Sequence, residues 1–315
     1  APRSASFAPT CFSAPRPIGS GLVVQPVGLR VLDALGAGDA ARALGAPIFR
    51  MQGHAKGRLA LDVDYAPAAP GLALHRAALF HVLWQAALAA GTTFCCDATV
   101  VGAPIRAGKR VLIRSAGDPL GPFDLVIDAS GAGSVLSTLR PRTLPFGAIW
   151  GNVLWPADSA LPQDQLTQRY DRAQRMAGVL PIGRLPGETA SRAAVFWSLP
   201  LHQLDEWPNR DLADWKAEVT TLWPQMHPFL TGLASTANLT PARYSHGTLR
   251  RPFDAALVFI GDAAHRASPQ LGQGANMALL DAFALAHALT ALPLDDALPA
   301  YARSRRWHVR SYQSL

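Results

Sequence analysis

The chain has 315 residues, of which 49% are hydrophobic and 16% are charged, which is enough apolar content for one large globular domain or two unequal ones. It holds 29 Lys and Arg against 22 Asp and Glu, a formal charge of +7. Nearly all of these cations are single Arg residues. The one cluster, Arg303, Arg305, Arg306 and Arg310, falls on a terminal helical pattern, where a solvated helix face explains it, so we predict no nucleic-acid partner.

The cysteines argue against a disulfide-rich or metal-binding protein, and the longest apolar run argues against a membrane-spanning protein. The three cysteines, Cys11, Cys95 and Cys96, form neither an even set nor a CxxC pair, so no disulfide framework and no metal site is expected. A reducing compartment suits them, and we expect a cytoplasmic protein. The run 275–292 is interrupted by Asp281 and His287, so we expect no bilayer-spanning segment. No pattern indicates an oligomeric state.

The first half of the chain alternates predicted strands and helices. Residues 26–35 have apolar side chains at helical spacing, and Gly36 and Gly38 end that helix. The run 123–129 is almost continuously apolar, which is typical of a buried strand in a parallel sheet, covered on both faces. The expected elements are strand 22–25, helix 26–35, strand 58–63, helix 76–90, paired strands 93–101 and 110–114, and strand 123–129.

The composition changes after Pro145, where tryptophans become frequent. Strand-like runs at 147–154 and 193–199 and a helix at about 211–222 predict a broad aromatic-rich sheet with one helix. These indoles could line a pocket, but core packing is the commoner role, and the substrate cannot be read from them. The tryptophans of this region are Trp150, Trp155, Trp197, Trp207, Trp215 and Trp223.

The most informative segment follows a short predicted strand at 256–260. It reads GDAAHRASPQLGQGANMALLDA and starts at Gly261. The strand delivers Asp262, a loop follows, and glycines then allow a ligand to approach the backbone before a helix at about 276–292. The first amides of such a helix have no partner within it, and its positive end favours an anion. A last helix is expected from about residue 296.

This string resembles, almost position by position, the second FAD-binding motif of the flavoprotein aromatic monooxygenases of the para-hydroxybenzoate hydroxylase type. The resemblance implies that Asp262 contacts the ribityl chain and that Pro269 lies near the reactive edge of the isoalloxazine. It also implies that the glycine-rich helix start faces the flavin pyrimidine. The residues that it assigns to this helix start are Gly272, Gln273, Gly274, Ala275 and Asn276.

Other segments are similar to the same family with less specificity. Residues 17–36 look like the segment after the family's second strand, and Arg76 matches an arginine that reaches the cofactor at a helix start. The stretch 124–131 aligns with the family's middle motif, but Ser130 stands where an aspartate is usual, which bears on the nicotinamide step. Asp128 could replace that aspartate, or it could be a cap or turn residue.

A family member begins with a strand, a GxGxxG turn and a helix that hold the ADP pyrophosphate. Residues 1–13 are rich in Pro and Ser and predict no strand, and the stretch 36–41, which matches GxGxxA, follows a helix. We expect residues 1–16 to be a disordered or non-native leader. A fragment, a shifted reading frame and a true loss of the element all explain this, and we favour the first two. Exposed apolar sheet faces would then weaken stability.

The resemblance implies an α/β (α+β) protein with an incomplete Rossmann-like FAD-binding domain and an inserted mixed β-sheet substrate domain. We predict the first part of the FAD domain at 17–143, the substrate domain at 144–250, and the second part of the FAD domain with the C-terminal helix at 251–315. The implied reaction uses FAD, NAD(P)H and O2 to hydroxylate an aromatic or planar apolar small molecule.

Two alternatives stay open. One is a flavin oxidoreductase of another reaction type, such as a halogenase or an unsaturated-lipid reductase, although the Trp-x-Trp-x-Ile signature of halogenases is absent. The other is a noncatalytic remnant that binds no FAD. We name no catalytic residue, because the cofactor carries the chemistry and His265 belongs to the flavin motif, where a positioning role is expected.

Overall fold

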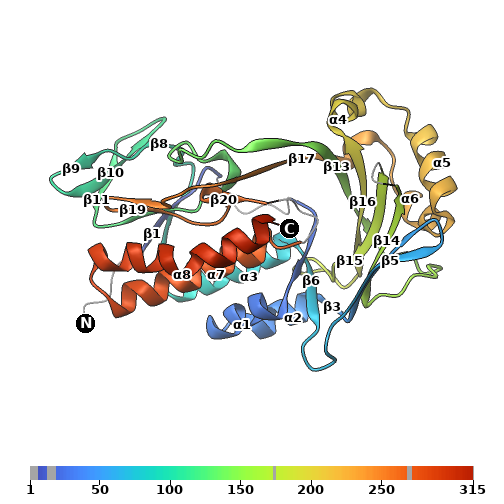
Figure 1. The fold of residues 1–315 in the computed structure, drawn as a ribbon, viewed down its shortest axis with the longest axis horizontal. Coiled ribbons are helices and arrows are strands. Elements are labelled where there is room, and N and C mark those ends of the chain that lie inside the picture. Colours follow the sequence, from blue (N-terminus) through green and yellow to red (C-terminus); the bar gives the residue numbers. More distant parts are fainter. Residues whose placement is uncertain (1–5, 13–18, 173–174, 268–271, 315) are drawn as a thin grey trace. The chain divides into compact units, whose positions relative to one another are not determined.

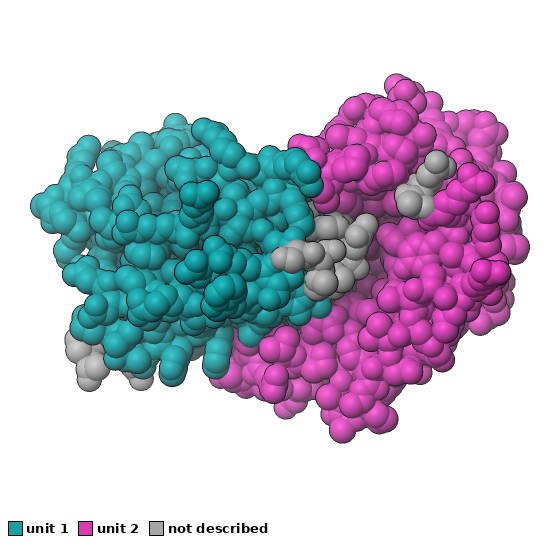
Figure 2. All heavy atoms as spheres, viewed as in Figure 1, with its two compact units in different colours: residues 1–16, 84–142, 245–315 teal, residues 17–83, 143–244 magenta. Residues whose placement is uncertain are grey.

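The computed structural model describes residues 6–12, 19–172, 175–267 and 272–314 (Figure 1). The chain forms two compact units, each built from segments that are far apart in the sequence (Figure 2). Unit 1 comprises residues 1–16, 84–142 and 245–315, and unit 2 comprises residues 17–83 and 143–244. Both helices and sheets contribute to the fold, so the predicted mixed α/β class is confirmed.

Unit 2 is built on a long mixed sheet whose strands alternate between two buried faces. On one strand, Ile149 and Val153 point into one core, whereas Trp150 packs on the opposite side against a second core. This alternation is the period of two expected for a strand covered on both faces. The strand order is β17 (Leu239–Thr248), β13 (Arg142–Leu154), β16 (Arg192–Pro200), β15 (Arg175–Pro181), β14 (Gln165–Asp171), β4 (Arg50–Ala55) and β5 (Arg58–Asp64).

Helices cover the first face of this sheet. They are α4 (Leu201–Glu206), α5 (Leu212–Leu222) and α6 (His227–Leu230). Helix α5 begins after Asp211, whose carboxylate accepts a hydrogen bond from Asp214 N at 2.9 Å, an N-cap that the sequence favours. The core interpretation is confirmed for the four tryptophans that are buried here, Trp197, Trp207, Trp215 and Trp223.

A small antiparallel sheet packs on the other face and supports the predicted helices of the first half of the chain. Its order is β2 (Gly21–Val24), β6 (Gly71–His75) and β3 (Ala46–Ile48). Helices α1 (Pro26–Ala34) and α2 (Gly38–Leu44) follow one another, so the GxGxxA stretch joins two helices, as expected for a segment that is not a phosphate loop. Helix α3 (Arg76–Ala89) starts directly after β6.

In unit 1, a short parallel pair of strands leads to the two C-terminal helices. Strands β12 (Val126–Asp128) and β19 (Leu257–Phe259) are parallel, and β18 (Phe253–Asp254) is antiparallel to β19. Helices α7 (Gly274–Ala291) and α8 (Leu294–Ser314) pack together over Val258. The expectation that 123–129 is covered on both faces is wrong at Ile127, which is 46% exposed. An apolar run indicates that a strand can be buried, but it does not determine which elements pack on each face of that strand.

The remaining strands of unit 1 correct two sequence expectations. The sequence predicted that the run 93–101 pairs as one strand with 110–114. In the structure this run forms two strands, β7 (Thr93–Cys95) and β8 (Val100–Gly102), and of these two it is β8 that pairs with β10 (Lys109–Arg114). Strand β10 also pairs with β9 (Ile105–Arg106) and β11 (Leu120–Phe123). Strand β7 pairs in parallel with β1 (Phe7–Pro9), so the expectation of no strand in residues 1–13 is wrong. Three residues are too few to show a hydrophobic period, and backbone pairing alone makes β1 a strand. Strand β20 (His265–Arg266) pairs with the end of β17.

The compact units and the predicted domains divide the chain differently. The unit boundaries at 142/143 and 244/245 lie near the predicted boundaries of the substrate domain, but residues 17–83 belong to the same unit as that sheet. The units follow packing, whereas the predicted domains follow the order of motifs. The four-part division, including the nature of the leader 1–16, therefore stays a prediction. Among the described residues, no helix has the length and apolar composition needed to cross a bilayer.

We expect Gly178→Ala to destabilise unit 2. Gly178 on β15 pairs with Phe196 on β16, and an added Cβ would lie 1.9 Å from Cζ of that ring. The ring is 5% exposed and its centroid lies 4.5 Å from that of Trp150, so it has little room to move. Overpacking of this kind costs about 1–3 kcal/mol, measurable by urea unfolding. Gly102→Ala is the control, because its Cβ would make an ordinary 3.8 Å contact. Equal unfolding midpoints in the two variants would contradict the expectation.

Candidate cofactor site

The loop after β19 places Asp262 at the surface of unit 1. A short 3-10 helix, Gly261–Ala263, carries this residue, and Gly261 has a φ of +58°, which favours glycine. An added Cβ on Gly261 would lie 3.2 Å from the Cβ of Ala278, so the loop packs closely on α7. The Asp262 side chain is exposed and has no partner among the described residues, which leaves its carboxylate available to accept hydrogen bonds from a ligand.

The start of α7 is open. The N-cap residue Gln273 makes no side-chain cap, and the first turn contains no acidic residue. Gly272 has a φ of +60°, and a Cβ added at Gly272 or Gly274 would meet no described atom within 4 Å. The first amides of an α-helix have no partner within the helix, and the described surface at Gly272 and Gly274 is uncrowded, so amides of this helix start can donate to an anion or a carbonyl oxygen.

A hollow of about 30 Å³ lies beside this helix start. This volume is close to that of one water molecule, so a larger ligand would rest against the helix start rather than be enclosed by unit 1 alone. Asp262 and Gly274 line the hollow on one side, and the end of α8 lines it on another. The full lining is Asp262, His265, Ala267, Gln273, Gly274, Met277, Val309, Tyr312 and Gln313.

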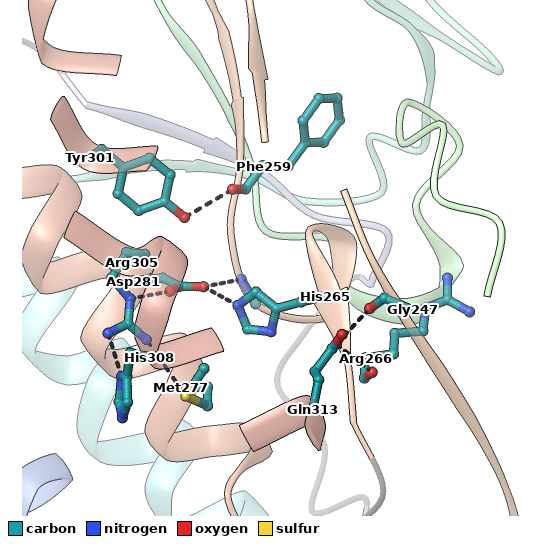
Figure 3. Close-up of polar contacts among 11 residues, drawn as sticks. Gly247, Phe259, His265, Arg266, Met277, Asp281, Tyr301, Arg305, His308 and Gln313 are labelled. Carbon is teal, nitrogen blue, oxygen red and sulfur yellow. Dashed lines mark hydrogen bonds and ion pairs between the residues drawn. The ribbon is translucent and has the colours of Figure 1, made fainter. Parts of the chain in front are cut away.

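Beneath the hollow, a buried ionic network centres on Asp281 (Figure 3). Its Oδ2 accepts hydrogen bonds from Gly261 N at 2.9 Å and from His265 Nε2 at 2.6 Å, and its Oδ1 accepts one from Arg305 Nε at 2.7 Å. Arg305 Nη1 lies 2.7 Å from His308 Nδ1, to which it donates. The side chain of Asp281 is fully buried, so this carboxylate ties the loop, α7 and α8 together.

The pKa values in this network follow from burial and charge. Burial alone would raise the pKa of Asp281, but the hydrogen bonds and charges of His265 and Arg305 outweigh it and hold that pKa below its ordinary value. Burial and then the charge of Arg305 lower the pKa of His308. When its ring is neutral, His308 can accept at Nδ1 the hydrogen bond that Arg305 Nη1 donates. Asp281 is thus ionised at neutral pH and has a fixed set of donors.

The structure brings together most residues that the sequence assigned to the cofactor. Asp262, Gln273 and Gly274 line one hollow, with Gly272 and Ala275 next to them in the chain. Asn276 is only 1% exposed, and its Nδ2 donates to Gly272 O at 3.3 Å, so its side chain holds the turn. Pro269 lies outside the described residues. The cofactor roles of these residues stay predictions.

Two other sequence candidates have defined surroundings. Arg76 belongs to unit 2, where it begins α3, and its exposed side chain lies over Gly19. Asp128 is buried, and its carboxylate accepts hydrogen bonds from Ser130 N at 3.0 Å and from the hydroxyls of Ser130 and Ser134. These donors occupy Asp128, so the geometry favours its role as a turn residue over a role in nicotinamide binding.

Sequence reasoning missed the network around Asp281 and was wrong about one arginine. Arg305 was assigned to a solvated face, but it is 8% exposed and bound to Asp281. The signal was available, because Tyr301, Arg305 and Val309 are spaced by four residues and share the buried face of α8. An arginine in phase with an apolar stripe needs a buried anion.

A model of one protein family, described as FAD binding domain, matches residues 13–312. The chain belongs to the FAD binding domain family. The resemblance inferred from the sequence is therefore confirmed, and so is FAD as the cofactor of its family. A curated relative, 3-hydroxy-4-methyl-anthranilyl-[aryl-carrier protein] 5-monooxygenase of Streptosporangium sibiricum, is 32% identical over 209 residues, 64% of this chain and 54% of the relative. The match thus spans about half the length of that relative.

Solved structures share the fold. PqsL of P. aeruginosa, in complex with 2-aminobenzoylacetate, superposes with a TM-score of 0.83 at 20% identity, covering 98% of this chain and 87% of PqsL. HpxO of Klebsiella pneumoniae, complexed with FAD and uric acid, has a TM-score of 0.80 at 20% identity, covering 97% of this chain and 79% of HpxO. At this identity the likeness establishes the fold alone.

The residues at the start of α7 fit FAD. The glycines leave room for a planar group, the uncapped helix start offers amide donors, and Asp262 offers an acceptor for hydroxyl groups. No described side chain lies within 4 Å of a Cβ placed at Gly272 or Gly274. This donor and acceptor set suits a ligand that combines carbonyl oxygens with a polyhydroxyl chain, as FAD does.

Proposed function

We propose that the protein is an FAD-dependent monooxygenase that hydroxylates an aromatic or similar planar small molecule with NAD(P)H and O2. The observation that carries the proposal is the start of α7, which has no side-chain cap, beside the exposed carboxylate of Asp262, which has no partner among the described residues. The name of the Streptosporangium relative describes an aryl group attached to a carrier protein, and we include carrier-attached aryl acids in the substrate class. A cytoplasmic location is part of the same proposal.

In this proposal the chain positions the cofactor, and the cofactor supplies the redox and oxygen chemistry when bound. The first amides of α7 would hold the flavin by donating hydrogen bonds to it, and the positive end of the helix would favour a negative charge there. Asp262 accepts hydrogen bonds from hydroxyl groups, and Arg76 reaches an anionic part of the cofactor. His265 is a positioning residue, because its Nε2 is bound to Asp281 and holds the loop that carries Asp262.

We also propose that this chain binds FAD more weakly than a protein with a glycine-rich strand–turn–helix. The one GxGxxA stretch of the sequence, 36–41, joins α1 to α2 and therefore does not present a helix start at the end of a strand. The pyrophosphate would then contribute less to binding than the groups at α7.

The test is a flavin titration followed by turnover. The purified protein is titrated with FAD, and quenching of flavin fluorescence gives the dissociation constant. The holoenzyme is then supplied with NADH or NADPH, 18O2 and aryl acids such as 3-hydroxyanthranilate, and products are examined by mass spectrometry. Incorporation of one 18O atom into an aromatic product supports the proposal. A protein whose melting temperature and fluorescence titration do not respond to FAD would instead be a noncatalytic relative.

A further inference from the structure

Helix α8 has two faces of different character. Its buried face packs beside α7 (Figure 1), and Leu298, Tyr301 and Val309 lie at the helical spacing of that contact. Arg305 joins this face through its ion pair with Asp281. The arginine cluster of the sequence is thereby divided, because one of its four members is an internal residue and the other three are exposed.

The exposed face carries a tryptophan among the other three arginines. Trp307 is 70% exposed, the most of any large apolar side chain in the described chain. Arg306 and Arg310 lie over its ring, with Cζ 5.7 Å and 5.4 Å from the ring centroid. Residues 303–315 contain no Asp or Glu. We define Arg303, Arg306, Trp307 and Arg310 as the α8 stripe.

The composition of the α8 stripe indicates protein recognition. An exposed Trp is costly to keep in water, and Trp and Arg are the residues most enriched among those that dominate binding energy at protein interfaces. Two cation–π contacts hold the ring and both guanidinium groups in one arrangement before any partner binds, which lowers the entropy lost on binding. A complementary surface would offer carboxylates around an apolar recess for the indole.

Two other ligand classes fit less well. A membrane-binding helix needs a broad apolar face, but the apolar face of α8 is occupied by α7, and only Trp307 remains for the bilayer. A nucleic acid would stack bases on the indole, but Arg306 and Arg310 already lie over this ring. Charge complementarity therefore points to an acidic protein surface.

We propose that the α8 stripe is the docking surface for an acidic carrier protein that presents the aryl substrate. This inference rests on the proposed function in one respect, the attachment of the substrate to a carrier. Docking through a charged stripe suits a carrier that must bind and leave in each turnover, because electrostatic steering speeds association without requiring a large interface.

The experiment measures carrier binding without turnover. An aryl-carrier protein of net negative charge, labelled with a fluorophore, is titrated with the full chain, and fluorescence anisotropy gives the dissociation constant. We expect the triple variant R303Q/R306Q/R310Q and the single variant W307A each to bind at least about tenfold more weakly. Raising NaCl from about 50 to about 300 mM is expected to weaken the wild type strongly and the triple variant little.

The matched control removes three positive charges elsewhere. Arg58, Arg106 and Arg250 are exposed, and R58Q/R106Q/R250Q is expected to bind the carrier within about twofold of wild type. Equal losses in the two triple variants, wild-type affinity in the stripe variants, or no binding by the wild type would overturn the inference. Stripe-dependent sedimentation with phosphatidylserine vesicles, or stripe-dependent binding of a single-stranded oligonucleotide, would also overturn it by assigning the surface to another ligand.

The outcome is separable from the proposed function. FAD titration of the stripe variants is expected to match the wild type, since no residue of the stripe lines the hollow at α7. Hydroxylation of a free aryl acid without carrier binding would refute the inference and leave the function standing. Carrier binding that depends on the α8 stripe, in a protein that binds no FAD, would support the inference and refute the proposed function.

Discussion

Replacing Asp281 with Ala is expected to lower the free energy of unfolding by on the order of 3–5 kcal/mol, because it leaves a buried guanidinium without its anion. Arg305 and His265 would both lose their acceptor, and Gly261 N would lose its hydrogen bond. All of these groups are buried, so water cannot replace the carboxylate at low cost. Chemical denaturation followed by circular dichroism measures the change.

Two further variants separate charge from shape. Asp281→Asn keeps the size of the side chain and removes its charge, so it is expected to lose a large part of the same stability. Asp124→Asn is the control in the same unit, because Asp124 pairs with Lys109 at the exposed surface, 2.9 Å from Oδ1 to Nζ, where solvent screens the charges. A midpoint for Asp281→Asn as close to wild type as that of Asp124→Asn would show that the network contributes no stability.

The Asp281 network also predicts a pH dependence with a definite sign. The pKa of Asp281 is lowered in the folded protein from 3.8, so the unfolded chain takes up a proton first as pH falls. The contribution of this carboxylate to stability is therefore fully present above about pH 4 and is lost as pH falls through the folded pKa. Unfolding of the wild type and of Asp281→Asn is compared from pH 7 downwards, and the difference in stability should begin to narrow as pH falls below about 4. A constant difference between them would contradict the assignment.

The elements that the sequence predicted well are those whose signal lies within a single segment. Helices α1, α3 and α5 and strands β13 and β16 were each recognised from the residues of their own segment, so their neighbours were not needed to find them. Strand β1 is the opposite case, because three residues become a strand only through their partner β7. Ile127 shows the same limit. The apolar run 123–129 predicted a buried strand, but whether a side chain is covered depends on neighbouring elements that the run itself does not reveal.

The candidate site divides in the same way. Asp262 and the glycines of the α7 start were found because their order along the chain reports a strand, a loop and a helix. The ion pair between Asp281 and Arg305 could not be predicted from the order of residues, because the two residues are 24 positions apart. Their contact depends on how α8 packs against α7. Phase along α8 does separate its arginines: Arg305 shares the apolar face, and Arg306 and Arg310 flank Trp307 on the other.

Replacing Gly274 with Leu is expected to raise the dissociation constant for FAD about 100-fold without loss of fold. The backbone of Gly274 does not require glycine, because its φ is not positive and a Cβ there meets no described atom within 4 Å. Leucine is also the better helix former. A ligand that accepts hydrogen bonds from the first turn must approach the backbone closely, and a leucine side chain would keep it away. Loss of two charge-assisted hydrogen bonds, about 3 kcal/mol, corresponds to about 100-fold in affinity.

Gly232→Leu is the matched control for this effect. Gly232 also has open space at its Cβ and no positive φ, but it lies in unit 2 near the end of α6, outside the hollow at α7. Both variants should unfold at the wild-type midpoint, and only Gly274→Leu should lose FAD in the fluorescence titration. If Gly274→Leu bound FAD as the wild type does, the first turn of α7 could not be in contact with the flavin. The family assignment would then stand, but the cofactor would be held by other residues of the chain.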